Sequence, residues 1–157
     1  MQSSENMLHG TAQRCAGALW SCRSSSGRWT PNFRGGEDMA DEYLESIHVR
    51  CREANGKIFV AEQDNLVVGF AAVMSQEKFT EPDEPLGTYA LISDLVVLSQ
   101  YRRHGIGKQL LEHAERFAKA AGAKEIRIGV LALNTGARKL YRSAEFMPHL
   151  EVFVKRW

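Results

Sequence analysis

Cysteine is scarce in this sequence, and so are groups of metal-binding side chains. The three cysteines, Cys15, Cys22 and Cys51, are odd in number and no two have CxxC spacing. Such a set argues against a disulfide framework and against a cysteine zinc site. The five histidines show no ligand-like spacing either. We therefore expect no metal ion, and a reducing, cytoplasmic setting.

The sequence also lacks an excess of charge of either sign and a long hydrophobic run. It has 20 Lys and Arg residues and 19 Asp and Glu residues, which gives a net charge of +1. A nearly neutral chain is a poor candidate for binding nucleic acid or a membrane surface. The longest apolar run near the N-terminus, residues 16–20, is too short for a signal peptide or a membrane span. These absences predict a soluble protein with neither nucleic acid nor membrane as partner.

The length of 157 residues predicts one domain with one core. Residues 1–36 are the least readable part, because they contain serine- and glycine-rich patches and no clear strand. A short helix at residues 11–22 is the one element that they suggest. We place the domain at residues 37–157 and treat 1–36 as an N-terminal segment of unassigned structure.

The first half of this domain has a helix followed by strands. Apolar residues recur at helical spacing over residues 37–54, and Asn55-Gly56 ends the helix. Residues 57–62 and 67–74 then form an antiparallel strand pair, joined by a polar turn. The acidic, proline-containing stretch 75–87 reads as a loop, and an apolar strand buried on both faces follows at residues 89–98.

A basic, glycine-containing turn joins that strand to the next helix. It contains Arg102, Arg103, His104, Gly105, Ile106, Gly107 and Lys108. Glycine lets the backbone take unusual φ values and approach a ligand closely, and a helix starting at Gly107 would offer its first N–H groups to an anion. The spacing fits neither a Walker loop nor a dinucleotide-binding fingerprint. Taken alone, so short a motif is as compatible with an ordinary basic turn as with a diphosphate site.

The second half alternates helix and strand. An apolar stripe predicts a helix up to residue 121, and residues 124–131 form a strand parallel to the 89–98 strand. A short helix covers residues 137–144. Alternating apolar residues predict a last, antiparallel strand at 150–157.

Two motifs in this order resemble those of the GNAT superfamily of N-acetyltransferases. The first is Arg102-x-x-Gly105-x-Gly107, and the second is Asn134 followed by Ala137 and Tyr141, with Phe146 after the helix. The resemblance covers residues 37–157, although family members often have glycine where Arg103 stands. It implies an α/β (α+β) fold with a mixed, mostly antiparallel twisted sheet flanked by helices. In that fold a parallel strand pair is splayed around acetyl-CoA.

The resemblance also implies roles for individual residues. Asn134 would bind the pantetheine arm, backbone N–H groups near Val97 would polarise the thioester carbonyl, and Tyr141 would protonate the departing thiolate. Periodicity alone favours Tyr141 as a core aromatic residue. The residues assigned to acetyl-CoA are Leu95, Val96, Val97, Arg102, Arg103, His104, Gly105, Ile106, Gly107, Lys108, Asn134, Ala137 and Tyr141.

An amine must lose a proton before it attacks a thioester. Asp94 is the carboxylate within the 89–98 strand, so it is the candidate base; a solvent-facing or arginine-paired aspartate is an equal alternative. The sequence thus predicts an acetyl-CoA-dependent N-acetyltransferase acting on a primary amine, a small molecule slightly favoured, and it leaves a homodimer open. The alternatives are a peptide or protein N-acetyltransferase, a non-catalytic acyl-CoA-binding module and, least favoured, a nucleic-acid binder.

Overall fold

The computed structural model of the chain describes residues 37–79, 87–155 and 157. Its elements follow the chain in the order α2 (Glu37–Glu53), β1 (Gly56–Gln63), β2 (Leu66–Lys78), β3 (Thr88–Val97), a 3-10 turn (Ser99–Tyr101), α3 (Ile106–Ala120), β4 (Ile126–Ile128) and α4 (Thr135–Ser143). The N-terminal segment 1–36, with the helix expected at residues 11–22, lies outside the described residues.

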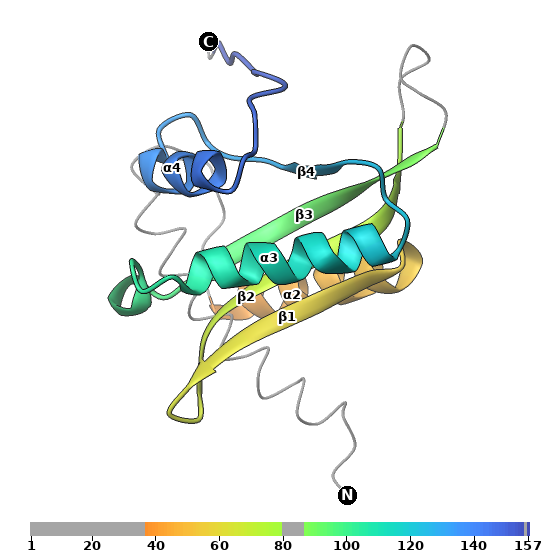
Figure 1. Ribbon diagram of the computed structural model, residues 1–157. Helices are drawn as coiled ribbons and strands as arrows, with labels where there is room; N and C mark the ends of the chain where they lie inside the picture. The colour runs from red at the N-terminus through yellow and green to blue at the C-terminus, as the bar shows by residue number, and fades with distance from the viewer. Residues whose placement is uncertain (1–36, 80–86, 156) are drawn as a thin grey trace, which may run out of the picture.

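The described strands form one sheet in the order β1-β2-β3-β4. The pairs β1–β2 and β2–β3 are antiparallel, and β3 pairs with β4 in parallel across the α3 crossover. This confirms the predicted mixed, mostly antiparallel sheet and its parallel strand pair. In Figure 1, α3 lies in front of the sheet and α2 behind it, so both faces of the central strands are covered.

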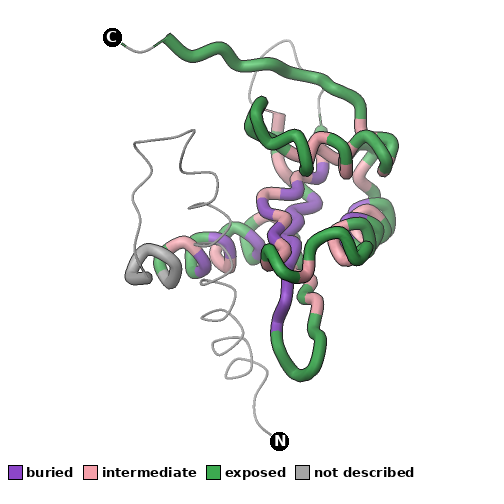
Figure 2. The backbone as a smooth tube through the Cα atoms, turned by 90° about the vertical axis from the view of Figure 1, so that its left-hand side faces the viewer, coloured by how far each residue is buried: buried purple, intermediate pink, exposed green. Residues whose placement is uncertain are grey.

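Each face of the sheet carries its own apolar cluster. Behind the sheet, the α2 side chains Leu44, Ile47 and Cys51 pack with side chains of β2 and with Val96. In front, Leu111 and Ala114 of α3 pack with Ile92, and α4 adds half-buried side chains to the same cluster. Figure 2 shows the buried residues concentrated in the sheet and on the inner faces of the helices. Cys51 is therefore the core residue that its helical spacing predicts.

Strand β3 contains a bulge at Ser93. Ala72 is opposite Asp94 and Val73 is opposite Ile92, so Ser93 has no Cα partner on β2. One extra residue interrupts the two-residue alternation of a strand. Ile92 therefore belongs to the α3-side cluster, whereas Asp94 shares the α2 side with Val96. The bulge decides which face of the sheet receives the Asp94 carboxylate.

Two predicted strands differ most in length from the structure. β2 continues to Lys78, where the sequence indicated a loop from residue 75, because Glu77 and Lys78 pair with the beginning of β3. Before them, Ser75 and Gln76 donate backbone hydrogen bonds to the Ala54 carbonyl, both at 3.1 Å. The Ser75 hydroxyl also donates to the Asn55 carbonyl at 2.7 Å. β4 is shorter than the predicted 124–131, because its pairing with β3 ends at Ile128.

The predicted last strand at 150–157 is wrong. Residues 150–155 and 157 have no strand conformation in this structure, and their large apolar side chains are exposed, those of Phe153 and Trp157 almost fully. Alternation indicates a strand only where a sheet edge and an apolar surface receive it. The segment leads away from the sheet in Figure 1 and meets neither.

Candidate active site

The basic turn between β3 and α3 has two residues in left-handed backbone conformation. Arg103 has φ of 70° and Gly105 has φ of 82°. This conformation costs a side-chain-bearing residue about 1–2 kcal/mol, which explains why glycine suits both positions. α3 begins at Ile106, one residue before the predicted start, with Gly105 as its N-cap. The first N–H groups of such a helix lack intrahelical partners and favour an anion.

The two glycines of the turn have different reasons to be glycine. At Gly105 an added Cβ would meet nothing within 4 Å, so the backbone conformation is what requires glycine there. At Gly107 an added Cβ would lie 3.0 Å from Cδ2 of Leu140. Gly107 thus lets the start of α3 approach α4 closely. The sequence had assigned both glycines to contact with a ligand.

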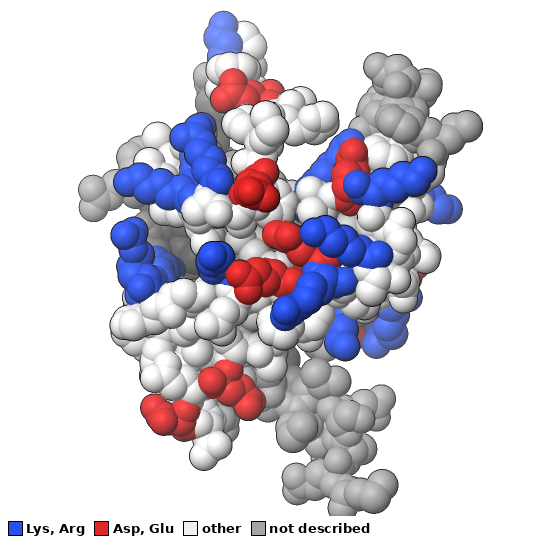
Figure 3. All heavy atoms as spheres, viewed as in Figure 1, with Lys and Arg blue, Asp and Glu red and all other residues white. Residues whose placement is uncertain are grey.

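Arg102 holds the turn to the end of β3. Its Nε donates a hydrogen bond to the Val97 carbonyl at 2.9 Å. Arg103, His104 and Lys108 extend the basic character of the turn, and all are exposed. In Figure 3, Lys and Arg side chains gather on the left of the view, where α4 lies above the beginning of α3. An anion that reached the first turn of α3 would meet this positive surface.

Beside the turn, β3 and β4 separate. Their paired residues are Ala90 with Ile126, Leu91 with Arg127 and Ile92 with Ile128. β3 runs on to Val97, so its last residues have no β4 partner. Backbone polar groups on an unpaired strand edge need other partners. This edge includes Leu95, Val96 and Val97, the strand residues assigned to the cofactor.

On the far side of the gap, Asn134 caps α4. Its Oδ1 accepts a hydrogen bond from the Ala137 N–H at 3.1 Å, as N-cap residues do. This capping contact was not predicted, and it engages two residues assigned to the cofactor. Tyr141, about two turns further, is half-buried in the α3-side cluster, with its ring centroid 6.1 Å from that of Phe146. The Tyr141 ring is therefore part of the packing, as its periodicity indicated.

Asp94 lies on the opposite face of β3 and is almost fully buried, with 9% of its surface exposed. Its Oδ1 accepts a hydrogen bond from the Tyr43 hydroxyl at 2.7 Å, and its Oδ2 accepts one from the Ser93 hydroxyl at 2.8 Å. The alternative of a solvent-facing aspartate is wrong, since the bulge turns this carboxylate toward α2. No ion pair with an arginine is found for Asp94 among the described residues.

Tyr43 is the site residue that sequence reasoning missed. It was interpreted as one more apolar position on the inner face of α2, and its ring does pack against the core there. The signal was its hydroxyl, because a tyrosine on a buried helix face usually needs a hydrogen-bond partner. The partner is 51 residues away in the sequence. Local spacing could not have identified it.

Cys51 lies near this carboxylate on the α2 face. Burial raises the pKa of the Cys51 thiol, the Arg50 guanidinium opposes this, and the Asp94 charge adds to it. A thiol with a raised pKa is a weak nucleophile at neutral pH. This agrees with its expected role in the core.

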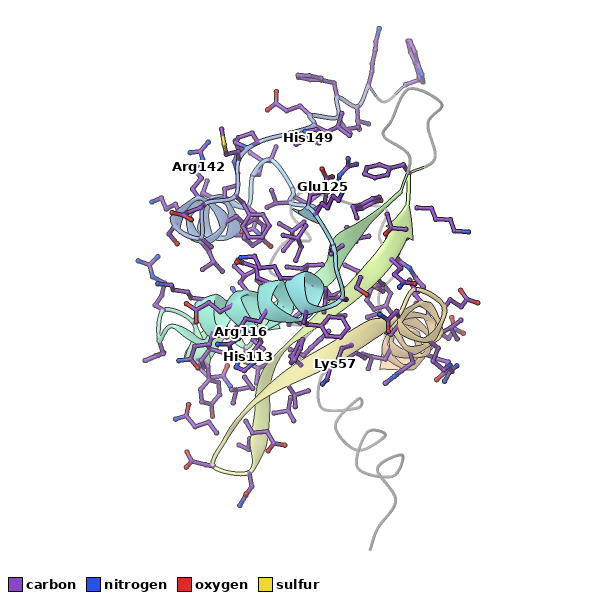
Figure 4. The ribbon with its side chains drawn as sticks, turned by 45° about the vertical axis from the view of Figure 1, so that its right-hand side comes forward. Lys57, His113, Arg116, Glu125, Arg142 and His149 are labelled. Atoms are coloured by element: carbon purple, nitrogen blue, oxygen red, sulfur yellow. The ribbon has the colours of Figure 1, made fainter. Side chains whose placement is uncertain are left out.

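Among the described residues, no group of three or more His, Cys, Asp or Glu could hold a metal ion. His113 is exposed on α3, but its ring centroid is 5.6 Å from that of Phe59 on β1. Lys57 also lies over the Phe59 ring. Figure 4 shows Lys57 and His113 on neighbouring elements, and Arg142 on α4 away from both.

Within the described part of the chain, no helix is long and apolar enough to cross a membrane.

Solved structures of known proteins share this fold. The Bacillus halodurans protein BH1408 superposes with a TM-score of 0.76 at 16% identity, over 95% of this chain and 94% of that one. AAC(6')-Iy bound to a bisubstrate analogue has a TM-score of 0.66 at 19% identity, over 94% of this chain and 92% of that one. The 6'-N-acetyltransferase AAC(6')-IG of Acinetobacter haemolyticus has a TM-score of 0.62 at 19% identity, over 80% of this chain and 85% of that one.

The sequence comparison gives the family. No curated protein matches the chain. The sequence profile of the acetyltransferase (GNAT) family, however, matches residues 20–146, which is most of the chain and includes both the basic turn and α4. The chain belongs to the GNAT family of acetyltransferases, enzymes that take their acetyl group from acetyl-CoA.

Proposed function

We propose that this acetyltransferase acts on a primary amine of a small molecule, with Asp94 as the base and Tyr141 as the acid. The observation that carries the proposal is the placement of the two residues. Asp94 lies on the α2 face of β3 and Tyr141 on the α3 face, beside the stretch where β3 has lost its β4 partner. An amine and a thioester can therefore approach this gap from opposite faces. We assign catalysis to residues 37–157.

The residues of the basic turn fit the diphosphate of acetyl-CoA. A diphosphate needs N–H donors and positive charge, and the turn offers the unpaired amides of the first turn of α3 beside Arg103, His104 and Lys108. The open space beside Gly105 leaves room for close approach to the backbone. Bound there, acetyl-CoA supplies an activated acetyl thioester.

Further along the arm, the unpaired edge of β3 offers backbone groups to the pantetheine amides. Asn134 uses one acceptor site of its Oδ1 to cap α4, so the second acceptor site and the donor Nδ2 remain for a ligand. Backbone N–H groups near Val97 would hydrogen-bond the carbonyl oxygen of the thioester. Such donors stabilise the negative charge that develops on this oxygen during attack.

Three proton transfers complete the reaction. Asp94 Oδ accepts the proton of the incoming ammonium, and the neutral nitrogen then forms a bond to the acetyl carbon. The bonded nitrogen, now positively charged, releases its second proton to solvent, the bond from the acetyl carbon to sulfur breaks, and the Tyr141 hydroxyl donates a proton to the departing sulfur. Asp94 returns its proton to solvent, and Tyr141 regains one, so that the enzyme is unchanged after each turnover.

The acceptor preference has two supports. Two of the similar structures are aminoglycoside acetyltransferases, which act on small amines. The described residues also form a single sheet with its flanking helices, with no second domain among them for holding a larger partner. A peptide or protein amine is the second candidate. It differs in requiring an extended contact surface on the enzyme.

The test is acetyl transfer by the full-length protein to neamine, spermidine and a lysine-containing peptide with a free N-terminus. We measure the release of CoA and the mass of each product. The expected result is a kcat/KM at least about tenfold higher for neamine or spermidine than for the peptide. Preference for the peptide would instead support the second candidate. Binding of acetyl-CoA without acetylation of any of the three amines would contradict the proposed enzyme function.

Asp94→Asn tests the base. The amide keeps the shape of the side chain but cannot accept the proton, so kcat should fall by about 10²-fold or more, the usual range for a general base. Affinity for acetyl-CoA should stay unchanged. The matched control is Asp64→Asn, in the exposed turn between β1 and β2. Wild-type kcat in folded Asp94→Asn would remove Asp94 from the mechanism.

A further inference from the structure

The buried carboxylate of Asp94 does not stand alone, because Tyr43 of α2 reaches it across the space between helix and sheet. The Tyr43 hydroxyl lies 2.7 Å from Oδ1 of Asp94. The Tyr43 ring packs against the cluster formed by α2, β2 and Val96. The ring is therefore held by apolar contacts, and the hydroxyl is aimed at the carboxylate.

The position of Tyr43 is set by the way α2 is attached to the sheet. At the end of the helix, the Ala54 carbonyl accepts hydrogen bonds from the N–H groups of Ser75 and Gln76. The buried Ser75 hydroxyl donates a hydrogen bond to the Asn55 carbonyl. Next to them, an added Cβ at Gly56 would lie 2.7 Å from the Cys51 Cα. Helix and sheet thus meet without space for a side chain. This close junction therefore sets the position of Tyr43 along the strands of the sheet.

The two carboxylate oxygens of Asp94 have one donor each, Tyr43 on Oδ1 and Ser93 on Oδ2. A carboxylate oxygen has two acceptor sites, so each retains one for a further N–H. Two donors from different directions also fix the plane of the carboxylate. The carboxylate is thereby oriented before a substrate arrives. The one hydrogen bond from Ser93 would not fix that orientation by itself.

We propose that Tyr43 is a positioning residue for acetyl transfer, because its hydroxyl orients the Asp94 carboxylate for the incoming ammonium. This rests on the proposed role of Asp94 as base. This role adds no chemical step to the proposed reaction. The ammonium N–H bond breaks, its proton goes to Asp94, and Tyr43 keeps its own proton while donating the hydrogen bond.

Among the described residues, few other polar groups lie beside this carboxylate. Cys51 of α2 lies near it, while Arg50 forms its ion pair with Glu77 at 2.9 Å. From β2, Ala72 is opposite Asp94, and on β3 itself the neighbour is Ser93. Removing the Tyr43 hydroxyl therefore removes one of the two side-chain hydrogen bonds that orient the carboxylate.

The experiment compares Tyr43→Phe with wild type, using acetyl-CoA and neamine, or spermidine if neamine is not acetylated. The phenylalanine keeps the packing and loses the hydrogen bond. We expect kcat to fall about tenfold while KM for the amine stays within about twofold of wild type, because the carboxylate loses a hydrogen bond that orients it and the packing of the ring is unchanged. Affinity for acetyl-CoA should not change. The control is Tyr89→Phe, the same substitution in a ring packed against Phe79 and Arg127.

Three outcomes would overturn the inference, and they are distinguishable from each other. If Asp94→Asn is inactive but Tyr43→Phe has wild-type kcat, the positioning role is wrong while the proposed base stands. If Asp94→Asn retains wild-type kcat, the base is wrong and the inference falls with it. If Tyr43→Phe slows Asp94→Asn as strongly as it slows wild type, Tyr43 acts independently of the carboxylate.

Discussion

The two faces of β3 are built in different ways. On the α3 face, the basic turn is exposed, and its geometry comes from the left-handed backbone at Arg103 and Gly105 and from a helix start. On the α2 face, the Asp94 carboxylate is buried, and side chains distant in the sequence hold it in place.

The difference shows what kind of ligand each face can accept. Backbone amides and exposed cations suit any diphosphate, so in the proposed function the turn would be a general anchor for the common acetyl donor. A buried carboxylate with two fixed donors has strict geometry, because desolvation makes unpaired polar contacts costly. Selectivity for the acceptor should therefore depend on the α2 face, and affinity for the donor on the α3 face.

The variant Tyr141→Phe tests the comparison at the gap where the two faces of β3 meet, and it has the largest expected effect. If the hydroxyl protonates the departing sulfur, its loss should lower kcat by about 10²-fold or more. The ring stays, so acetyl-CoA affinity and thermal stability should remain close to wild type. Steady-state and single-turnover rates together are the measurement. Single-turnover rates equal to wild type would limit Tyr141 to packing, and water would then be the proton donor.

Gly107 tests whether the anchor depends on the contact between α3 and α4. In Gly107→Ala, the new Cβ would lie 3.0 Å from Leu140 Cδ2, so α4 must move. We expect about tenfold weaker binding of CoA by calorimetry, and more for Gly107→Val. Adding Leu140→Ala should restore the affinity of Gly107→Ala, with Leu140→Ala alone as the control. A double variant that stays weak would show that the Cβ interferes with the diphosphate directly.

The variants Arg103→Gly and Arg102→Gly form a matched pair, and their expected effects are the smallest. Arg103→Gly relieves a left-handed backbone, but glycine also gains entropy in the unfolded chain, so the free energy of unfolding should change by less than about 1 kcal/mol. Arg102→Gly gains the same entropy in the unfolded chain without relieving the backbone and also loses the hydrogen bond to the Val97 carbonyl, so it should be less stable by about 1–2 kcal/mol. Both variants lose one positive charge. Equal denaturation midpoints would contradict the backbone argument.

Sequence reasoning succeeded where structure depends on neighbours in the chain. The helix ending before Gly56, the hairpin after it and the turn with Gly105 all follow from local spacing, and the structure confirms them. The parallel pairing of β3 with β4 was also correct, because a helix crossover leaves few other topologies.

It failed where distant contacts decide the outcome. The face of Asp94 depends on the bulge at Ser93, which leaves no signature in a Leu, Ile and Val-rich strand. The hydrogen bond from Tyr43 joins elements that periodicity treats separately. The alternation at residues 150–157 was correctly seen in the sequence, yet a pattern does not supply the neighbouring strand that would make it a strand.

The short helix α4 has a consequence for how the protein opens. It has nine residues and none of them is buried, whereas α3 has four buried residues among its fifteen. Elements with few buried contacts unfold locally at a lower free energy than the core. The amide protons of α4 should therefore exchange with solvent before those of α3, while the sheet remains intact. A ligand bound against Asn134 or Tyr141 would slow this exchange by mass action, so the order of α4 would then depend on occupancy.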